Sequence, residues 1–114
     1  MPEIGDVVEI IVNKPEHNLS LGFQGTIVHS HTHNTYEVEF TNQDGETLEV
    51  LALNLEEFVV VWQVETQEWV TVAEQTATII KQLPDNVAKE VLDFACFLSI
   101  KHSLLNHKMQ PEIA

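Results

Sequence analysis

The sequence contains no arginine and little positive charge of any kind. Its 114 residues include five lysines against 18 acidic residues, which gives a formal net charge of −13 at pH 7. Arginine is the preferred residue for two-point contacts with phosphate groups and with guanine edges. A chain without arginine, at this negative charge, lacks the electrostatic surface that attracts nucleic acids or anionic membranes. We therefore expect neither among its partners.

Cysteine and long apolar runs are also scarce. The single cysteine, Cys96, has no second cysteine in the chain with which to form a disulfide. Residues 1–6 lack the basic and apolar regions of a secretory signal peptide. The longest apolar stretch, residues 91–100, contains Asp93 and falls far short of the ~20 residues that span a bilayer. These absences predict a reducing, cytoplasmic location.

Catalytic motifs are missing as well. The sequence has no glycine-rich phosphate-binding loop, and none of its serines lies in a nucleophile-elbow motif. Cys96 lies within an apolar helical pattern, where a thiol is typically an inert buried group. The pairs Glu37/Glu39 and Glu56/Glu57 are candidate acid–base carboxylates, but outward carboxylates on a strand are more often a solvated face. We therefore predict that the protein is not an enzyme.

The charge that is present divides the chain in two. Residues 1–65 hold twelve acids and one lysine, a balance of −11, whereas residues 66–114 hold six acids and four lysines, a balance of −2. All four glycines lie in the first part. We predict two domains, residues 1–66 and residues 67–114, with the second packed on the first or on a partner subunit.

The first domain has the pattern of short strands separated by turns. The predicted strands are residues 7–12, 25–28, 36–40, 47–53 and 58–62. In the third strand Tyr36, Val38 and Phe40 alternate with two glutamates. This alternation places the apolar residues on one face and the carboxylates on the other. Five strands in about 60 residues are typical of a small closed barrel.

The second domain changes to helical spacing. A first apolar stripe recurs every three or four residues: Val72, Thr76, Ile80 and Leu83. Pro84 disfavours helical geometry in the residue before it, so this helix should end near Gln82. Asp85 or Asn86 then caps a second helix. The predicted fold class is α+β, a small five-stranded β-barrel followed by a C-terminal α-helical hairpin.

The second helix carries two apolar stripes rather than one. The first stripe contains Val87, Val91, Phe94, Leu98 and Leu105. The second stripe contains Leu92, Cys96, Phe97, Ile100 and Leu104. One stripe can pack on the first helix or on the barrel, and the other is then either buried between them or covered by another chain. We favour another chain, because a 114-residue protein has little mass left to cover both sides. The second stripe is therefore a predicted partner or homo-oligomer interface.

A set of glycine and core motifs runs through the first domain. The motifs are Ile4-Gly5-Asp6-Val7-Val8, the loop with Pro15-Glu16, Gly25-Thr26-Ile27-Val28, Tyr36-Glu37-Val38-Glu39-Phe40 and Asp44-Gly45-Glu46-Thr47. With these motifs, residues 4–62 resemble a family of short bacterial proteins of unknown function. The fold that the resemblance implies is a small SH3-like barrel.

A second group of motifs lies in residues 72–105. The motifs are Ile79-Ile80-Lys81-Gln82-Leu83-Pro84, Glu90-Val91-Leu92-Asp93-Phe94 and Phe97-Leu98. This segment is similar to a family of small helical hairpins that is often grouped with the antitoxins of bacterial toxin–antitoxin pairs. The resemblance implies an antitoxin-like role and a basic, toxin-like protein partner.

Three histidines form the only cluster with the character of a metal site. His29, His31 and His33 alternate, so on an extended strand their imidazoles would point the same way. Histidine is a good ligand for zinc and nickel. If His29 pairs with Glu37, the imidazoles share a face with carboxylates, whereas pairing with Val38 places them on the core side. The alternative is that His31 and His33 are solvated residues of the hairpin turn.

The leading functional hypothesis is a non-enzymatic acidic interaction protein without a cofactor. Its acidic surface, Glu37, Glu39, Glu46 and Glu49, would meet a basic protein partner, because complementary potentials speed encounter and exclude wrong partners. The C-terminal helices would mediate self-association. The alternative hypothesis is a metal-binding or metallochaperone-like protein that holds zinc or nickel with His29, His31 and His33.

Overall fold

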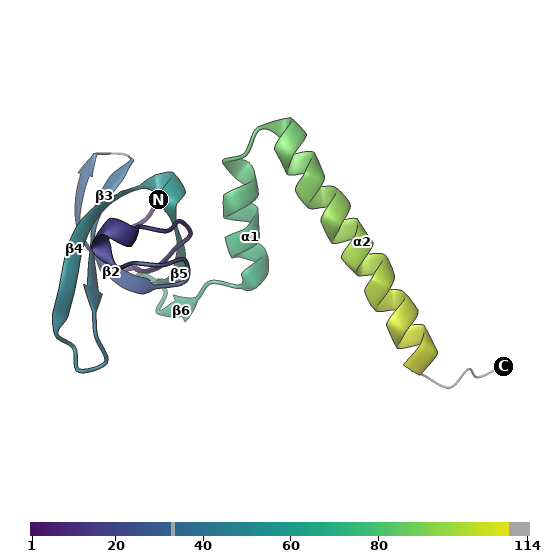
Figure 1. Cartoon of the computed structure of the whole chain (residues 1–114), viewed down its shortest axis with the longest axis horizontal. Coiled ribbons are helices and arrows are strands. Elements are labelled where there is room, and N and C mark those ends of the chain that lie inside the picture. The colour runs from purple at the N-terminus through teal and green to yellow at the C-terminus, as the bar shows by residue number, and fades with distance from the viewer. Residues whose placement is uncertain (33, 110–114) are drawn as a thin grey trace. The chain divides into compact units, whose positions relative to one another are not determined.

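A computed structural model describes residues 1–32 and 34–109 of the chain. Contacts between residues group the chain into two units, Met1–Ile79 and Ile80–Ala114. In chain order (Figure 1) the elements are β1 (Val7–Ile10), η1 (Pro15–His17), β2 (Gln24–Thr32), β3 (Thr35–Thr41), β4 (Thr47–Asn54), η2 (Leu55–Glu57), β5 (Phe58–Gln63), β6 (Glu68–Trp69), α1 (Val72–Lys81) and α2 (Asp85–Met109). The domain boundary expected after residue 66 stays a prediction.

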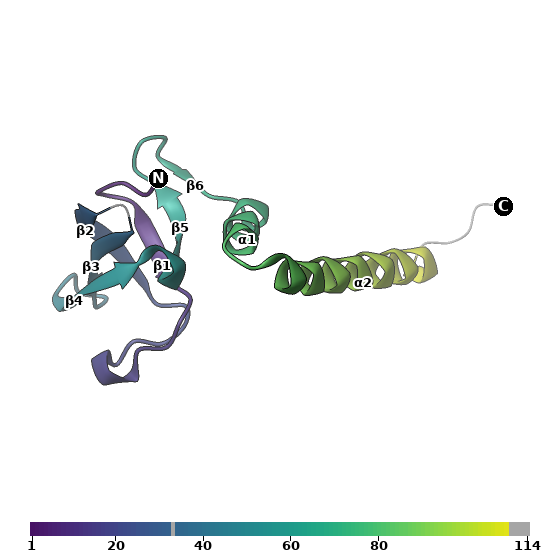
Figure 2. The same ribbon diagram turned by 90° about the horizontal axis from the view of Figure 1, so that it is seen from above.

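The predicted α+β class is confirmed, because residues 1–32 and 34–109 form six antiparallel strands followed by two helices. The strand order is β4-β3-β2-β1-β5-β6. The expected barrel is wrong, because β4 and β6 stand at opposite ends of this order and do not pair in the part of the chain that the structure describes. The open sheet nevertheless curls, as Figure 2 shows. Leu53 of β4 and Phe58 of β5 accordingly belong to one core cluster. The SH3-like fold implied by the resemblance is not confirmed.

The sixth strand is the one that the sequence pattern did not predict. β6 forms a hairpin with β5, in which Trp62 pairs with Trp69 and Gln63 with Glu68. The turn places Gln67 in the left-handed region at φ 57°, and its N–H donates to the carbonyl of Gln63 at 2.8 Å. Glycine or asparagine is the usual signal for that conformation. A two-residue strand after a glutamine turn shows neither strand alternation nor a turn signal.

The core of the first unit lies on one face of the curled sheet. Nine residues form it: Val8, Ile10, Leu19, Ile27, Tyr36, Val38, Phe40, Leu53 and Phe58. The predicted alternation in β3 is confirmed, because Tyr36, Val38 and Phe40 are at most 2% exposed. The rings of Tyr36 and Phe58 meet edge to face, with their centroids 5.7 Å apart. Burial of these side chains stabilises the unit by roughly 1.5–3 kcal/mol each.

One carboxylate is buried at the edge of this core. Asp6 is 4% exposed, and its two oxygens accept hydrogen bonds from the backbone N–H of Glu3 at 2.9 Å and of Val64 at 3.0 Å. The backbone carbonyl of Asp6 accepts from the N–H of Ile27 at 3.0 Å. Asp6 therefore ties the N-terminal segment to β2 and to the end of β5, which is a structural role.

The glycine of the Gly25-Thr26-Ile27-Val28 motif is required by packing. A Cβ atom at Gly25 would lie 2.6 Å from Cγ1 of Val38 and 2.9 Å from the carbonyl oxygen of Glu39. These distances are too short for any real side chain, so β2 and β3 approach each other closely only because position 25 is glycine. This motif residue carries fold information rather than chemistry.

The two helices lie close to their predicted limits. α1 ends at Lys81, one residue before the position expected from Pro84, and α2 begins at Asp85. Thr71 caps α1, because its Oγ1 accepts a hydrogen bond from the N–H of Glu74 at 3.1 Å. Among the described residues, neither helix combines the length and the apolar content that crossing a bilayer requires.

Candidate functional site

The orientation of the histidines is decided by a β-bulge in β2. Ile27 pairs with Val38 on the core side, and simple alternation would carry His29 to the same side. The register shifts between Ile27 and His29, however, so that His29 pairs with Glu37. Val28 is the additional residue and is 40% exposed. The sequence left two registers open for His29. The structure has the one in which His29 pairs with Glu37 and the imidazoles share a face with carboxylates.

His29, His31 and Glu37 gather on the outer face of the sheet. Nε2 of His31 lies 3.1 Å from Oε1 of Glu37, and the imidazole rings of His29 and His31 meet edge to face at 4.6 Å. The side chains of His31 and Glu37 are 44% and 38% exposed, so water screens their attraction. A hollow of about 640 Å³ adjoins His31. The hollow is lined by Met1, Pro2, Glu3, Ser30, His31, Thr32 and Tyr36.

This cluster does not form a metal-binding group in the described part of the chain. Within residues 1–32 and 34–109, no three histidine, cysteine, aspartate or glutamate side chains are placed to hold a metal ion. The third expected ligand, His33, lies outside the described residues. The metal-site hypothesis therefore stays a prediction. The contacts that are present are the polar pair of His31 with Glu37 and the ring contact of His29 with His31.

The predicted acidic surface is divided between three places. Glu37 and Glu39 lie together on the outer face of β3 and are half-buried. Glu46 lies in the exposed turn between β3 and β4, where its Oε1 accepts from the side chain of Asn42 at 3.2 Å. Glu49 pairs across the strands with Phe40 and so lies on the core side of the sheet edge.

Apolar side chains adjoin the carboxylates of β3 on the neighbouring edge strand. Glu39 pairs with Val50, and its Oε2 accepts from Oγ1 of Thr47 at 2.6 Å. Leu48 and Val50 are 58% and 48% exposed on β4, which is the last strand of the sheet on this side. The outer face therefore combines carboxylates with exposed apolar groups beside an open strand edge.

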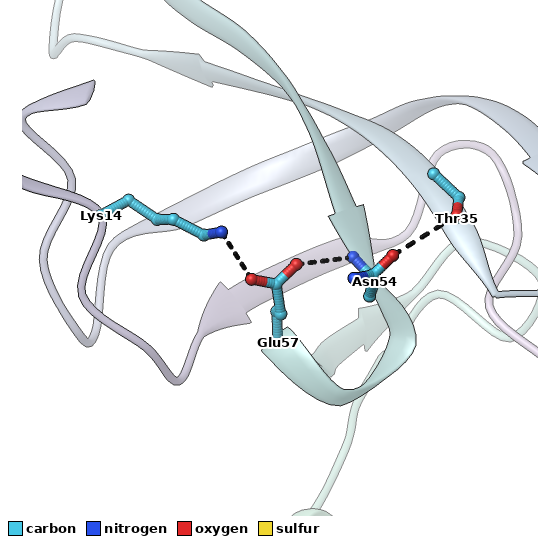
Figure 3. Close-up of polar contacts among 4 residues, drawn as sticks. All are labelled: Lys14, Thr35, Asn54 and Glu57. Atoms are coloured by element: carbon cyan, nitrogen blue, oxygen red, sulfur yellow. Dashed lines mark hydrogen bonds and ion pairs between the residues drawn. The ribbon is translucent and has the colours of Figure 1, made fainter. Parts of the chain in front are cut away.

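The groups with shifted pKa values form a different contact, shown in Figure 3. Nζ of Lys14 lies 2.6 Å from Oε2 of Glu57, and Oε1 of Glu57 accepts from the N–H of Asn54 at 2.8 Å. Oδ1 of Asn54 accepts in turn from Oγ1 of Thr35 at 3.4 Å. The Lys14 and Glu57 side chains are 24% and 17% exposed. The contact joins the loop before η1 to η2.

The physical causes of the two pKa shifts support a structural role for this contact, the Lys14–Glu57 clamp. Burial disfavours the charged form of Glu57, but the hydrogen bonds from Asn54 and Lys14 outweigh it and hold the pKa of Glu57 below its ordinary value. The hydrogen bond to Glu57 is the main cause that raises the pKa of Lys14. Both shifts keep the pair charged at neutral pH. The signal for this clamp was present in the sequence, because Asn54 and Glu57 have the spacing of a helix capping box.

The predicted interface stripe on α2 is exposed within its unit. Cys96 is exposed, in contrast to the buried thiol that its apolar neighbours suggested. The large apolar residues of α2 that are exposed are Leu92 at 55%, Phe94 at 62%, Phe97 at 57%, Leu98 at 45%, Ile100 at 63%, Leu104 at 59% and Leu105 at 49%. They come from both stripes. Val87 and Val91 of the first stripe are partly buried, so the exposure is greatest from Leu92 onward.

A shallow apolar hollow lies on the second half of α2. It has a volume of about 320 Å³ and is lined by Phe97, Ile100, Lys101, Leu104 and Leu105. The rings of Phe94 and Phe97 stack beside it, with their centroids 6.3 Å apart. A hollow between exposed apolar side chains and one lysine can receive an apolar side chain that is accompanied by a carboxylate.

Comparison with known proteins places the first unit in a family. Searches of curated proteins and of solved structures give no match to this chain. A family model matches residues 4–60. The match includes β1 to β4, the start of β5 and all of the motifs quoted from the first domain. The family is described as a domain of unknown function, DUF4926. The antitoxin-like resemblance of residues 72–105 stays a prediction. On the evidence of the matched residues, the chain belongs to the DUF4926 family.

Proposed function

We propose that this protein is a non-enzymatic interaction protein. Its acidic sheet binds a basic protein partner, and α2 joins two copies of the chain. The observation that carries the proposal is the exposure of seven large apolar side chains on α2, which range from 45% to 63% exposed. Exposed apolar residues are normal when scattered, but a contiguous set marks an interaction surface.

The exposed set on α2 is large enough for a specific interface. A large apolar or aromatic side chain that is half exposed leaves roughly 100 Å² accessible. Over both stripes, seven such residues expose roughly 700 Å² on each copy, compared with ~300–600 Å² for the largest apolar patch of a typical monomer. A helix that is apolar on most of its circumference also depends on tertiary or quaternary contacts for its stability.

The acidic sheet supports the choice of a basic partner. Residues 1–65 carry a balance of −11, and Glu37 and Glu39 stand beside the exposed Val50 at the edge strand. Complementary charge accelerates encounter, while apolar contacts and an open strand edge provide affinity. The antitoxin-like resemblance of residues 72–105 fits this arrangement, because a toxin with a basic surface is such a partner.

Self-association is tested by light scattering after size exclusion on the full chain. We expect a dimer at about 100 µM, since interfaces of this size commonly hold in the micromolar range or tighter. Phe97→Asp should give a monomer. Ser99→Asp is the matched control, because it adds the same charge two residues away on the opposite side of the helix and should leave the dimer intact. A monomeric native chain at this concentration contradicts the proposal.

The basic partner is tested by affinity purification with the native chain and with Glu37→Gln/Glu39→Gln. We expect the native chain to retain a basic protein that dissociates at high salt, because screened charges contribute less to binding. The variant should lose it, and Glu46→Gln in the turn should retain it. The captured protein is then purified and its binding is measured directly. A captured protein that is acidic, or that binds the variant equally well, rules out the acidic face as the binding site.

A further inference from the structure

A seam of six residues runs along α2 at alternating spacings of three and four. The residues are Val87, Glu90, Phe94, Phe97, Lys101 and Leu104. This repeat places its members on one line of a helix, as in the core positions of a coiled coil. The seam follows the border between the two apolar stripes, and Phe94, Phe97 and Leu104 in it are 62%, 57% and 59% exposed.

When the seam is read in the reverse direction, each residue type lies opposite a type that it can pair with. From the N-terminus the seam has an apolar residue, an acid, two phenylalanines, a base and an apolar residue. We propose that the occupant of the seam is the same seam of a second copy in antiparallel orientation, with Glu90 against Lys101 of the second copy. The inference rests on the self-association proposed above and adds its orientation and register.

Every position of the seam finds a matching partner in this register. Val87 meets Leu104, Glu90 meets Lys101, and Phe94 meets Phe97, and a two-fold axis generates each pair twice. The exposed charges at positions 90 and 101 are thereby paired where the interface removes water from them. Phe94 and Phe97 already stack within one helix and would form a four-ring cluster at the centre of the dimer.

Charge excludes the parallel alternative. In a parallel pair in register, Glu90 faces Glu90 and Lys101 faces Lys101, and like charges in a desolvated seam are strongly unfavourable. The other carboxylate near the seam, Asp93, forms an ion pair with Lys89 of its own helix. Glu90 is therefore the carboxylate left to meet Lys101. A single polar pair within an apolar seam is a known means of selecting helix orientation and register.

A charge exchange on the full-length chain tests the orientation. Lys101→Glu places two glutamates against each other and Glu90→Lys places two lysines against each other, so each variant should raise the dimer Kd by about tenfold or more. The double variant Glu90→Lys/Lys101→Glu restores both opposite pairs and should return the Kd to within about threefold of native. Lys81→Glu in α1 makes the same charge change away from the seam and should have no effect.

A distance measurement gives an independent readout. In the Cys96→Ser background, a spin label at Ser103→Cys lies 15 residues along the helix axis from its counterpart in the antiparallel register. With a rise of 1.5 Å per residue, the labelled backbones should be about 22 Å apart along the axis. In a parallel pair in register the two labels have no axial offset, so the distance between them should be clearly shorter than in the antiparallel pair.

The outcomes separate this inference from the proposed function. A dimer in which the double variant stays as weak as the single variants overturns the antiparallel seam and leaves self-association standing. A distance between the labels that shows no axial offset has the same consequence. If the dimer Kd is the same for the native chain and all three charge variants, α2 pairs through another face and the seam is overturned. A native chain that is monomeric by light scattering overturns both the seam and the self-association.

Discussion

The sheet of the first unit and helix α2 place their apolar residues in opposite environments. In the sheet the nine core residues are at most 3% exposed, and the one buried carboxylate, Asp6, has hydrogen-bond partners on both oxygens. In α2 every large apolar side chain from Phe94 to Leu105 is at least 45% exposed. The apolar residues of the sheet are thus covered by the sheet's own unit, whereas those of α2 are exposed. The difference identifies the sheet as the source of structural stability and supports the proposal that α2 mediates association.

The largest expected contrast comes from one substitution made in both regions. Phe40→Ala removes a side chain that is 2% exposed, and should lower the free energy of unfolding of the sheet by about 3–5 kcal/mol. Phe97→Ala removes a side chain that is 57% exposed, and should change sheet unfolding by less than about 0.5 kcal/mol while weakening the dimer. Denaturant titration and light scattering measure the two effects. If both variants destabilise the sheet equally, the comparison is wrong.

A smaller effect is expected at the buried carboxylate. Asp6→Ala leaves the backbone N–H groups of Glu3 and Val64 without their acceptor, which should cost about 1–3 kcal/mol in thermal or denaturant unfolding. Asp44→Ala removes the same charge from an exposed turn and should change stability by less than about 0.5 kcal/mol. Equal effects of the two substitutions would assign the loss to net charge instead of to the buried hydrogen bonds.

The smallest effect concerns the Lys14–Glu57 clamp and depends on pH. Glu57→Gln should lower the free energy of unfolding by about 0.5–1 kcal/mol at pH 7, because it removes the ion pair and keeps an acceptor for Asn54. The folded pKa of Glu57 lies below the ordinary value of 4.5. Its contribution is therefore complete above pH 4.5 and is lost as the pH falls through the folded pKa. The difference between native and variant should shrink over that range.

The matched control for this pH dependence is the neighbouring position. Glu56→Gln removes the same charge from an exposed residue of η2, and should leave both the stability and its pH profile unchanged. Urea titrations from pH 3 to pH 7 compare the three proteins. A Glu57→Gln penalty that persists undiminished at pH 3 means that the charge of Glu57 does not act through the clamp.

Local patterns predicted the elements of this protein well where one face of an element is buried. The five expected strands are present, and Pro84 correctly separates the two helices. Both results follow from neighbouring residues, since alternation and proline geometry act within a few positions. The hairpin strand β6 was missed, because Gln67 adopts a left-handed conformation that its residue type does not signal.

The candidate site was predictable only in part. The histidines and Glu37 were named from the sequence, but which way they face depended on a bulge that neither strand displays alone. The acidic residues were also named, yet Glu49 lies on the core side of β4 and is 3.5 Å from Nδ1 of His17, a residue far from it in the sequence. Pairing between distant segments decides which face of the sheet such residues occupy. The composition of the sequence does not specify that pairing.

The sequence by itself determined the α+β class, the acidic first half, the apolar second helix and the alternation of Tyr36, Val38 and Phe40. These properties are set by residue type and local spacing, which the fold does not alter. Only the tertiary structure decided that the sheet is open in the described residues, that His29 pairs with Glu37, and that Gly25 must lack a side chain. Each of these depends on the register and close approach of strands, which arise when the chain folds and remote backbone segments must satisfy their hydrogen bonds together.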